Sequence, residues 1–463
     1  MGVNLLSAYI ANVSPTYEYK KYAYIVFAVL NMAGKSRWVY HKCEIKIDMG
    51  QLSKSTHSLL LILLVLLVTN YGSIDASASN STSSTREVSP IEMEKIKQYL
   101  KMINKPAVKS IKTIVGDLID CIPIHKQPAF DNPLLKNHSV QMVPSAVPKY
   151  TGRSYTSNYT ESVRQSWNDV GQCPNGTVPI RRTTLEDVLR AGSLSQFGKK
   201  QITYTARGAG SEHEYAIAWP GGTQSTIYGT KATFNVWAPY VQVTYEFSLA
   251  QLWITAGSYS TQDLNTIEAG WQVYRFLYGD SRPRLFIYWT KDAYQTTGCY
   301  NHKCAGFVQT DNSIALGGAL SPVSSYGGNQ YEIPIVIWKD PGTRNWWMRV
   351  GNKNVGYWPA KLFTRLSSYA TDVEWGGEIV NVRTNGAHTT TRMGSGQFAK
   401  SGFKKASYVR DLATVDSRNT LRPVQSIVTH ADNANCYDIQ SYRSTNWGTY
   451  FFYGGLGKNS LCR

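Results

Sequence analysis

The second half of the chain is a succession of short aromatic and β-branched runs, and this pattern limits the possible folds more than any other feature. The runs begin after about residue 201 and are separated by turn-forming clusters such as Asp340-Pro341-Gly342. They cover residues 234–237, 245–254, 267–277, 284–290, 333–338, 346–350 and 373–380. Aromatic residues make up 12% of the chain and charged residues only 17%, a balance that suits half-buried pleated surfaces. Many strand patterns with few helical ones predict an all-β sandwich or barrel.

An uninterrupted apolar run at residues 59–68 predicts a targeting signal. It is too short to span a bilayer comfortably but has the length of a signal-peptide core, and small residues follow it. Because such a signal starts a protein, we expect Met49 to be the true first residue, with a signal peptide at 49–76. Residues 1–48 would then be a spurious N-terminal extension. The alternative is a signal anchor that holds the protein at a membrane, which a run this short favours less.

The cysteines agree with a secreted protein. Removing residues 1–48 removes Cys43 and leaves six of the seven cysteines, an even number suited to disulfides in an oxidising compartment. Four N-glycosylation sequons lie before residue 200, at Asn80, Asn137, Asn158 and Asn175. We therefore expect a disulfide-bonded glycoprotein that is extracellular (in the apoplast) or vacuolar.

The part before the strand-rich region has a different character. After a Ser/Thr-rich stretch, Ser89-Pro90 begins a helix whose apolar stripe is Ile91, Ile96, Leu100 and Ile103. Residues 113–200 look irregular. We expect a front segment at 77–207, a β domain at 208–463 and a cut between them near Arg207.

The sequence lacks the residues that several classes of function require. The net charge of +17 comes without an RNA-binding signature, so a solvated basic surface is favoured and no nucleic-acid partner is expected. Met393-Gly394-Ser395-Gly396 is not a serine-hydrolase elbow. His213-Glu214 begins like a zinc-protease motif but lacks its second histidine, so Glu214 is assigned a surface or boundary role. Cys299 and Cys304 favour a short disulfide loop over a metal site. No metal or cofactor is expected.

Two strand patterns each carry a glutamate on the side away from the core. Ile267 and Trp271 belong to one face of the first strand, so Glu268 lies on the other face with Gln272 and Tyr274. Exposed glutamates on strands are usually only solvated. The pattern nevertheless allows a substrate groove bordered by Gln272 and Tyr274, with Gln272 a candidate donor to an oxyanion.

The second strand repeats this arrangement. Trp375 and Ile379 point inward, whereas Glu374 and Glu378 point outward, and Glu374 is a third candidate for the groove. Glycines beside both strand glutamates, such as Gly377, are costly in a strand unless a backbone or ligand must approach closely.

Seven stretches resemble the neprosin family, in both its activation peptide and its peptidase domain. The most specific are Thr266-Ile267-Glu268-Ala269-Gly270-Trp271 and Trp375-Gly376-Gly377-Glu378. The stretches are residues 116–123, 126–138, 265–273, 297–301, 375–378, 393–396 and 451–455. Together they extend the resemblance over about residues 90–463.

This resemblance implies a two-sheet antiparallel β-sandwich whose groove holds a catalytic pair, here Glu268 and Glu378. It implies a metal-free endopeptidase that cleaves after proline in acid, once the inhibitory front segment is removed. Its disulfides fall on Cys299–Cys304 and Cys436–Cys462, while a pairing of Cys121 with Cys173 is left open. The expected partners are proline-containing peptides and the chain's own front segment, with no membrane partner after signal cleavage.

The implied chemistry suits two carboxylates. Close carboxylates repel as anions, so one keeps its proton and the pair offers a base and an acid together. Two other readings use the same residues. One is a secreted, lectin-like β-sandwich that binds polysaccharide or peptide without cutting it, and the other is a glycosidase.

Overall fold

The computed structural model describes residues 8–9, 22–32, 38–48, 88–152, 160–200, 212–222 and 226–463. The chain divides into two compact units, Met1–Glu87 and Val88–Arg463. In the first unit the backbone forms an antiparallel sheet from β1 (Ala8–Tyr9), β2 (Tyr22–Met32) and β3 (Trp38–Asp48). The predicted signal peptide at 49–76 lies outside the described residues, and the prediction of a spurious extension stays a prediction.

The second unit begins with the expected helix, α2 (Pro90–Ile103). The Ser89 hydroxyl accepts the backbone N–H of Glu92 and caps the helix. Ile96 and Ile103 are buried, as the apolar stripe predicts, but Ile91 is 72% exposed. Ile91 lies in the first turn, ahead of the part of the helix that packs against the rest of the unit.

The region predicted to be irregular is ordered around a small antiparallel sheet of β4 (Lys109–Lys112), β5 (Leu118–Pro123) and β9 (Thr177–Arg181). A disulfide joins Cys121 to Cys173, and α3 (Leu185–Arg190) follows with a capping box of Thr184 and Asp187. Its other elements are short 3-10 helices and strands, which carry little periodicity: η2 (Ile124–Lys126), η3 (Pro128–Asp131), η4 (Pro133–Leu135), β6 (Lys149–Tyr150), β7 (Thr160–Ser162), β8 (Arg164–Gln165) and η5 (Ser166–Asp169).

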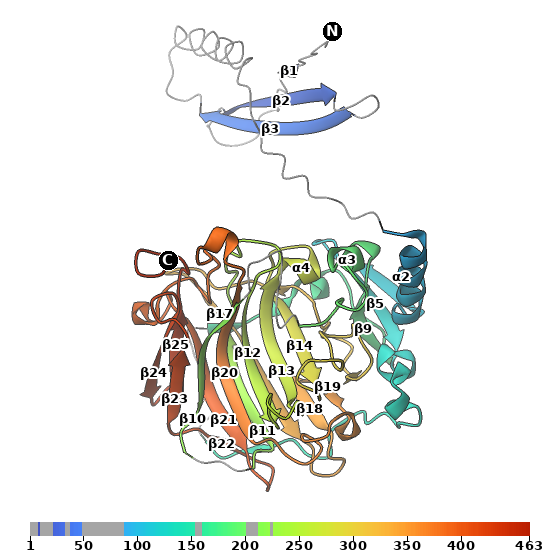
Figure 1. Cartoon of the computed structure of the whole chain (residues 1–463), viewed down its shortest axis with the longest axis vertical. Coiled ribbons are helices and arrows are strands. Elements are labelled where there is room, and N and C mark those ends of the chain that lie inside the picture. The colour runs from blue at the N-terminus through green and yellow to red at the C-terminus, as the bar shows by residue number, and fades with distance from the viewer. Residues whose placement is uncertain are drawn as a thin grey trace, which may run out of the picture. The chain divides into compact units, whose positions relative to one another are not determined.

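Residues 212–463 form two packed antiparallel sheets, which confirms the all-β prediction. The first sheet has six strands that lie side by side in one layer (Figure 1). In spatial order they are β14 (Arg284–Thr290), β13 (Asn265–Tyr274), β12 (Phe247–Ala256), β20 (Asp372–Asn381), β10 (Glu212–Pro220) and β23 (Ile427–Ala431). The predicted run to residue 277 ends early as a strand, because α4 (Arg275–Tyr278) begins there and closes on Gly279 in the left-handed region.

The second sheet lies against the first and has eleven strands, two of which, β6 and β7, come from the front segment. Its main order is β15 (Val308–Gln309), β19 (Lys353–Trp358), β18 (Trp346–Val350), β17 (Gln330–Lys339), β11 (Gly229–Asn235), β21 (Ser407–Val415), β22 (Thr420–Pro423) and β6. β24 (Asp438–Ser444) pairs with β25 (Gly448–Gly454), which pairs with β21. Outside these sheets are β16 (Leu320–Ser321), η6 (Ala360–Leu362), η7 (Thr384–Gly386) and η8 (Ala399–Ser401).

The main core fills the space between the two sheets. Ile267 and Trp271 of β13 and Trp375 of β20 belong to it, as the strand alternation predicts. The glutamates of those strands consequently point to the other face of the six-stranded sheet. Of the helices within the described residues, none combines the length and apolar character needed to cross a bilayer.

The front segment, residues 88–200, contacts the sandwich through strand pairing and through buried ion pairs. Its strands β6 and β7 pair in parallel with β22 and β17 of the second sheet. A buried ion network adds to this, because the Asp117 carboxylate bonds Arg181 of the front segment and Arg284 of β14, at 2.7 Å each. Asp280, on the sandwich, bonds Arg284 at 2.6 Å.

We expect Asp117→Asn to destabilise the second unit by about 3 kcal/mol or more, because it leaves two buried guanidinium groups with less negative charge than they need. The measurement is the urea dependence of unfolding at neutral pH. Asp169→Asn is the control, since Arg164 and Asp169 form an exposed pair with side chains 66% and 40% accessible, worth about 1 kcal/mol or less. Equal effects of the two substitutions would contradict a structural role for the network.

Candidate active site

Strand register brings Glu268 and Glu378 to the two sides of one residue, Gln251. β12 lies between β13 and β20, and Gln251 on β12 is directly opposite Gly270 on one side and Gly376 on the other. Glu268 and Glu378 stand two residues from these glycines, on the same face of the sheet as Gln251. The two predicted glutamates thus meet diagonally across three strands.

The two glycines are required by the close approach of neighbouring strands. A Cβ atom on Gly270 would lie 1.9 Å from the carbonyl oxygen of Ala250. One on Gly376, whose φ is +156°, would lie 2.2 Å from the carbonyl oxygen of Ala216. Only glycine fits both positions. Without side chains at either position, the two glutamates can lean over Gln251.

The amide of Gln251 joins the two carboxylates. Its Nε2 donates to Glu268 Oε2 at 3.2 Å and to Glu378 Oε2 at 3.3 Å, so one amide group reaches both acids. Its Oε1 is buried and has no hydrogen-bond partner among the described residues. The amide therefore fixes the spacing of the pair.

A lysine of the front segment contacts the same two carboxylates. Lys200 Nζ lies 3.2 Å from Glu268 Oε2 and 3.0 Å from Glu378 Oε2, and the Lys200 side chain is only 7% accessible. Burial alone would lower the pKa of Lys200, but the charges of Glu268 and Glu378 outweigh it and raise the pKa well above its ordinary value. Lys200 is therefore a cation held by both acids.

The outer oxygens of the two carboxylates have different partners. Glu268 Oε1 accepts the hydroxyls of Tyr294 at 2.6 Å and Thr266 at 2.9 Å. Glu378 Oε1 lies 2.5 Å from Nδ1 of His213. Burial alone would raise the pKa of Glu378, but Lys200 and His213 outweigh it and hold this pKa below its ordinary value. The outer oxygen of Glu268 thus accepts hydrogen bonds from two hydroxyl groups, whereas the outer oxygen of Glu378 contacts an imidazole nitrogen.

The glutamates are more buried than strand alternation predicts. It places them on a solvated face, whereas their side chains are 1% and 0% accessible. The front segment covers this face, because Phe197 and Val188 belong to one apolar cluster with Trp253 and Tyr288 of the sheet. The expectation of a wet surface is therefore wrong for the chain with its front segment in place.

The other three groove candidates lie on the same face but do not contact the pair. Gln272 Nε2 donates to the hydroxyl of Tyr278 at 3.0 Å, and Tyr274 is buried within the apolar cluster. Glu374 is half-buried and stands opposite Trp253 on β12. Their roles in a substrate groove stay predictions.

Sequence reasoning missed four residues of the site: Lys200, His213, Gln251 and Tyr294. His213 was considered only as part of an incomplete zinc motif. Gln251 lies within a predicted strand, but only the order of the strands places it between the two glutamates. Lys200 and Tyr294 lie in loops, where no periodicity indicates direction.

Glu214, expected at the surface, is buried and bonds His388. Its carboxylate oxygens lie 2.9 and 3.0 Å from His388 Nε2, and Asn381 donates to one of them. His388 Nδ1 lies 2.9 Å from the carbonyl oxygen of Thr389. Burial would lower the pKa of His388, but these acceptors outweigh it and raise the pKa. β10 alternation turns Glu214 to the face opposite His213, which explains the burial.

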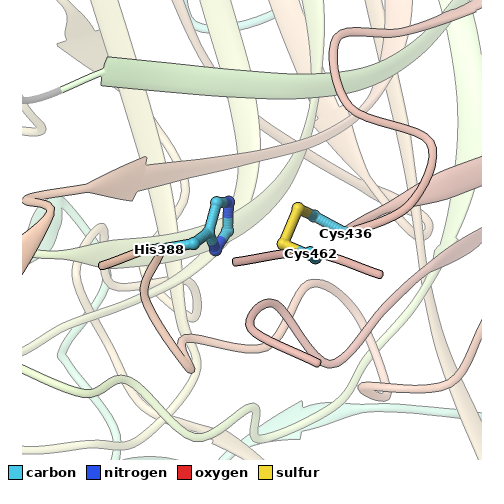
Figure 2. A group of neighbouring side chains, drawn as sticks. All are labelled: His388, Cys436 and Cys462. Carbon is cyan, nitrogen blue, oxygen red and sulfur yellow. A yellow bond between two sulfur atoms is a disulfide. The ribbon is translucent and has the colours of Figure 1, made fainter. Parts of the chain in front are cut away.

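His388, Cys436 and Cys462 lie close enough to suggest a metal site, but their chemistry does not fit one. The two sulfurs are joined in a disulfide beside the imidazole (Figure 2), so neither is a free thiolate ligand. Both imidazole nitrogens already face oxygen acceptors.

The remaining cysteine predictions are confirmed. Cys299 bonds Cys304 and Cys436 bonds Cys462, and the open question of the last pair is settled by the Cys121–Cys173 disulfide. Of the predicted glycosylation sites, Asn137 and Asn175 are exposed, whereas Asn80 and Asn158 lie outside the described residues. Glycosylation itself stays a prediction.

Comparison with known proteins agrees with the site. The Neprosin model matches residues 244–456, and the model of the Neprosin activation peptide matches residues 110–219. These matches support a peptidase made with an activation peptide, in keeping with the paired acids beneath a covering segment. The chain belongs to the neprosin family. The predicted boundary at 207 and 208 lies within the second match and stays a prediction.

Similar solved structures include two peptidases and a carbohydrate-binding module. Scytalido-glutamic peptidase, with a peptide-based transition-state analogue, is 13% identical and covers 53% of this chain and 98% of its own, with a TM-score of 0.28. SCP-B of the Eqolisin family, with the tripeptide Ala-Ile-His, is 12% identical over 53% and 98%, with a TM-score of 0.27. The CBM40 module of the Ruminococcus gnavus IT-sialidase, bound to α2,6 sialyllactose, is 9% identical over 37% and 90%, with a TM-score of 0.19. Similarities this remote carry no argument about activity.

Glu374 yields a prediction on pH. Burial and the nearby Asp372 raise the pKa of Glu374 to about 7, while His430 acts in the opposite direction. A raised carboxyl pKa means that the folded state disfavours the anion, so stability falls as the pH rises from about 4.5 to about 7. We expect Glu374→Gln to be more stable than the parent by about 1–3 kcal/mol at pH 8 and equal to it at pH 4.

Urea unfolding at the two pH values measures this difference. Glu94→Gln, at an exposed position of α2, is the control and should change stability by less than about 0.5 kcal/mol at both. A gain for Glu374→Gln that is the same at pH 4 and pH 8 would show that burial of the anion is not its cause.

Proposed function

We propose that the β domain is a secreted glutamic endopeptidase that cleaves peptide bonds on the C-terminal side of proline, in acid, after the front segment is removed. The observation that carries this proposal is the convergence of Glu268 and Glu378 on one buried ammonium, that of Lys200, supplied by the activation segment. The preference for proline and the secretion rest on the family resemblance and the predicted signal peptide.

In this proposal Glu378 is the base. His213 remains on the domain when Lys200 leaves, and its contact with Glu378 favours the ionised carboxylate of that residue. Glu378 Oε2 then takes a proton from a water molecule in the space that the Lys200 ammonium vacates. The oxygen of that water attacks the carbonyl carbon of the substrate.

Glu268 is the acid in the same step. The hydroxyls of Tyr294 and Thr266 donate to Oε1, which leaves Oε2, on the side of Glu378, to carry the proton. Two close carboxylates retain one proton in acid, and Glu268 passes it to the leaving nitrogen as the C–N bond breaks. The proton taken by Glu378 is then returned to solvent, and Glu268 is reprotonated from it.

Lys200 makes the uncut chain latent, because its ammonium fills the position of the attacking water. The pKa of the Glu378 carboxyl is lowered in the latent form. The contact between Glu378 and Lys200 therefore stabilises that form fully at pH values above the pKa of a free carboxyl. This stabilisation is lost as the pH falls through the lowered pKa of Glu378. Acid therefore weakens the hold of the front segment.

We expect Glu268→Gln and Glu378→Gln to lower kcat/KM of the processed enzyme by about 10²–10⁴ on a proline-rich peptide, because each removes one proton-transfer group. Product formation at acid pH is followed by mass spectrometry, which also reports the residue before the cut. Glu212→Gln, on β10 but paired with Arg383, is the matched control. The mechanism fails if either dyad variant cuts as fast as the parent. A parent that is inert on peptides yet retained by a polysaccharide column would favour the lectin-like alternative.

We expect Lys200→Ala to speed acid loss of the front segment at least tenfold, because the two carboxylates lose the cation that stabilises the latent arrangement. A time course of the uncut chain on gels at several pH values measures this rate. Lys199→Ala is the control, since Lys199 donates to the carbonyl oxygens of Thr296 and Gly298. Equal rates for the parent and the Lys200 variant would contradict the proposed latch.

A further inference from the structure

Among the described residues, the groups that contact the Lys200 ammonium form a receptor for a primary amine and belong to the β domain. Nζ lies within 3.2 Å of oxygens of both Glu268 and Glu378. It also lies 5.6 Å from the centre of the Tyr294 ring, within the range of a cation–π contact. Only the ammonium itself comes from the front segment.

The walls of this receptor are held in place without the lysine. Glu268 keeps its bonds from Tyr294 and Thr266, and Glu378 keeps its contact with His213. Gln251 continues to hold both carboxylates to one spacing. A site whose groups are fixed by other contacts pays less ordering cost when a ligand enters it.

The selectivity of the site follows from its atoms. A primary ammonium can donate one N–H to each carboxylate, as Lys200 does, whereas a quaternary ammonium has no N–H and an alcohol has no charge. The backbone N–H of Lys200 donates to the hydroxyl of Tyr288 at 3.2 Å, and Tyr288 belongs to the apolar cluster, so the lysine stem begins beside that cluster and ends at the two carboxylates. An unbranched alkyl chain matches this path.

We propose that the Glu268–Glu378 pair is a binding site for unbranched primary alkylammonium ions, which occupy the position of the Lys200 ammonium when Lys200 is absent. Where such an ion blocks peptide cleavage, the inference rests on the proposed function. The binding itself does not, because it needs only the two carboxylates and their fixed donors. The ligand competes for the space of the attacking water and is therefore an inhibitor of the processed enzyme.

The test is a chemical replacement of the missing side chain. The uncut Lys200→Ala chain is heated at neutral pH, at constant ionic strength, with n-butylammonium, tetramethylammonium or n-butanol. We expect n-butylammonium alone to raise the melting temperature, saturably and by several degrees, since a ligand of the folded state stabilises it. The parent and Lys199→Ala, which both retain Lys200, should not respond. Adding Glu268→Gln and Glu378→Gln to Lys200→Ala should abolish the shift.

A second measurement covers the case in which Lys200→Ala does not fold. The domain released from the parent by acid or by an added protease is titrated with the same three compounds in a calorimeter and in the peptide assay. We expect n-butylammonium to bind, and to inhibit competitively, at least tenfold more strongly than the other two. Binding without any peptidase activity would reject the proposed function and keep this inference. Equal binding of all three compounds, or of none, would overturn it.

Discussion

One ammonium shared by two buried carboxylates is the interaction on which the rest of the site depends. Isolated charges are costly to bury, and two like charges side by side are costlier still. This cost is reduced for Glu268 and Glu378 in the uncut chain, because the Lys200 ammonium contacts both carboxylates and the Gln251 amide donates to both. The same cost returns when Lys200 leaves, and a carboxylate pair that cannot remain doubly ionised must hold a proton. In the proposed mechanism, the arrangement that blocks the site in the uncut chain therefore also prepares its acid–base chemistry.

The sheet supplies the positions of the two glutamates and most of their hydrogen-bond partners, and Tyr294 and Lys200 are added from outside the strands. Strand order places Gln251 between Gly270 and Gly376, and the pleat turns both glutamates to its side. Residues of two strands and one loop then make the two acids unequal, with the hydroxyls of Thr266 and Tyr294 on Glu268 and the imidazole of His213 on Glu378. Two chemically identical side chains thereby acquire different surroundings, and the proposed mechanism assigns them different roles on that basis.

Strand patterns were sufficient to predict the fold class and the core face, and they placed both glutamates on the other face; the interpretation of the two as a pair came from the family resemblance. Ile267 and Trp271 on one strand, and Trp375 and Ile379 on the other, are four residues apart, an even number that keeps each pair on one face of a pleated strand, so their direction follows from the sequence alone. The partners of the pair could not be read in this way. Gln251 becomes central only once β12 is known to lie between β13 and β20, and Lys200 reaches the site from a different segment. Burial of the glutamates was missed for the same reason, since the covering segment meets the sheet only in three dimensions.

The docking of the front segment on the sandwich affects how latency ends. Its strands continue the second sheet and its Asp117 is buried against Arg284, contacts that do not depend on an unbroken chain between Lys200 and His213. While the chain is continuous, the local concentration of the lysine is fixed by the tether and is the same in every molecule. Once the chain is cut, occupancy becomes an equilibrium between two species and falls with dilution. Cleaved molecules kept at high concentration in a storage compartment would then remain inactive, and the same molecules diluted into a larger volume would become active.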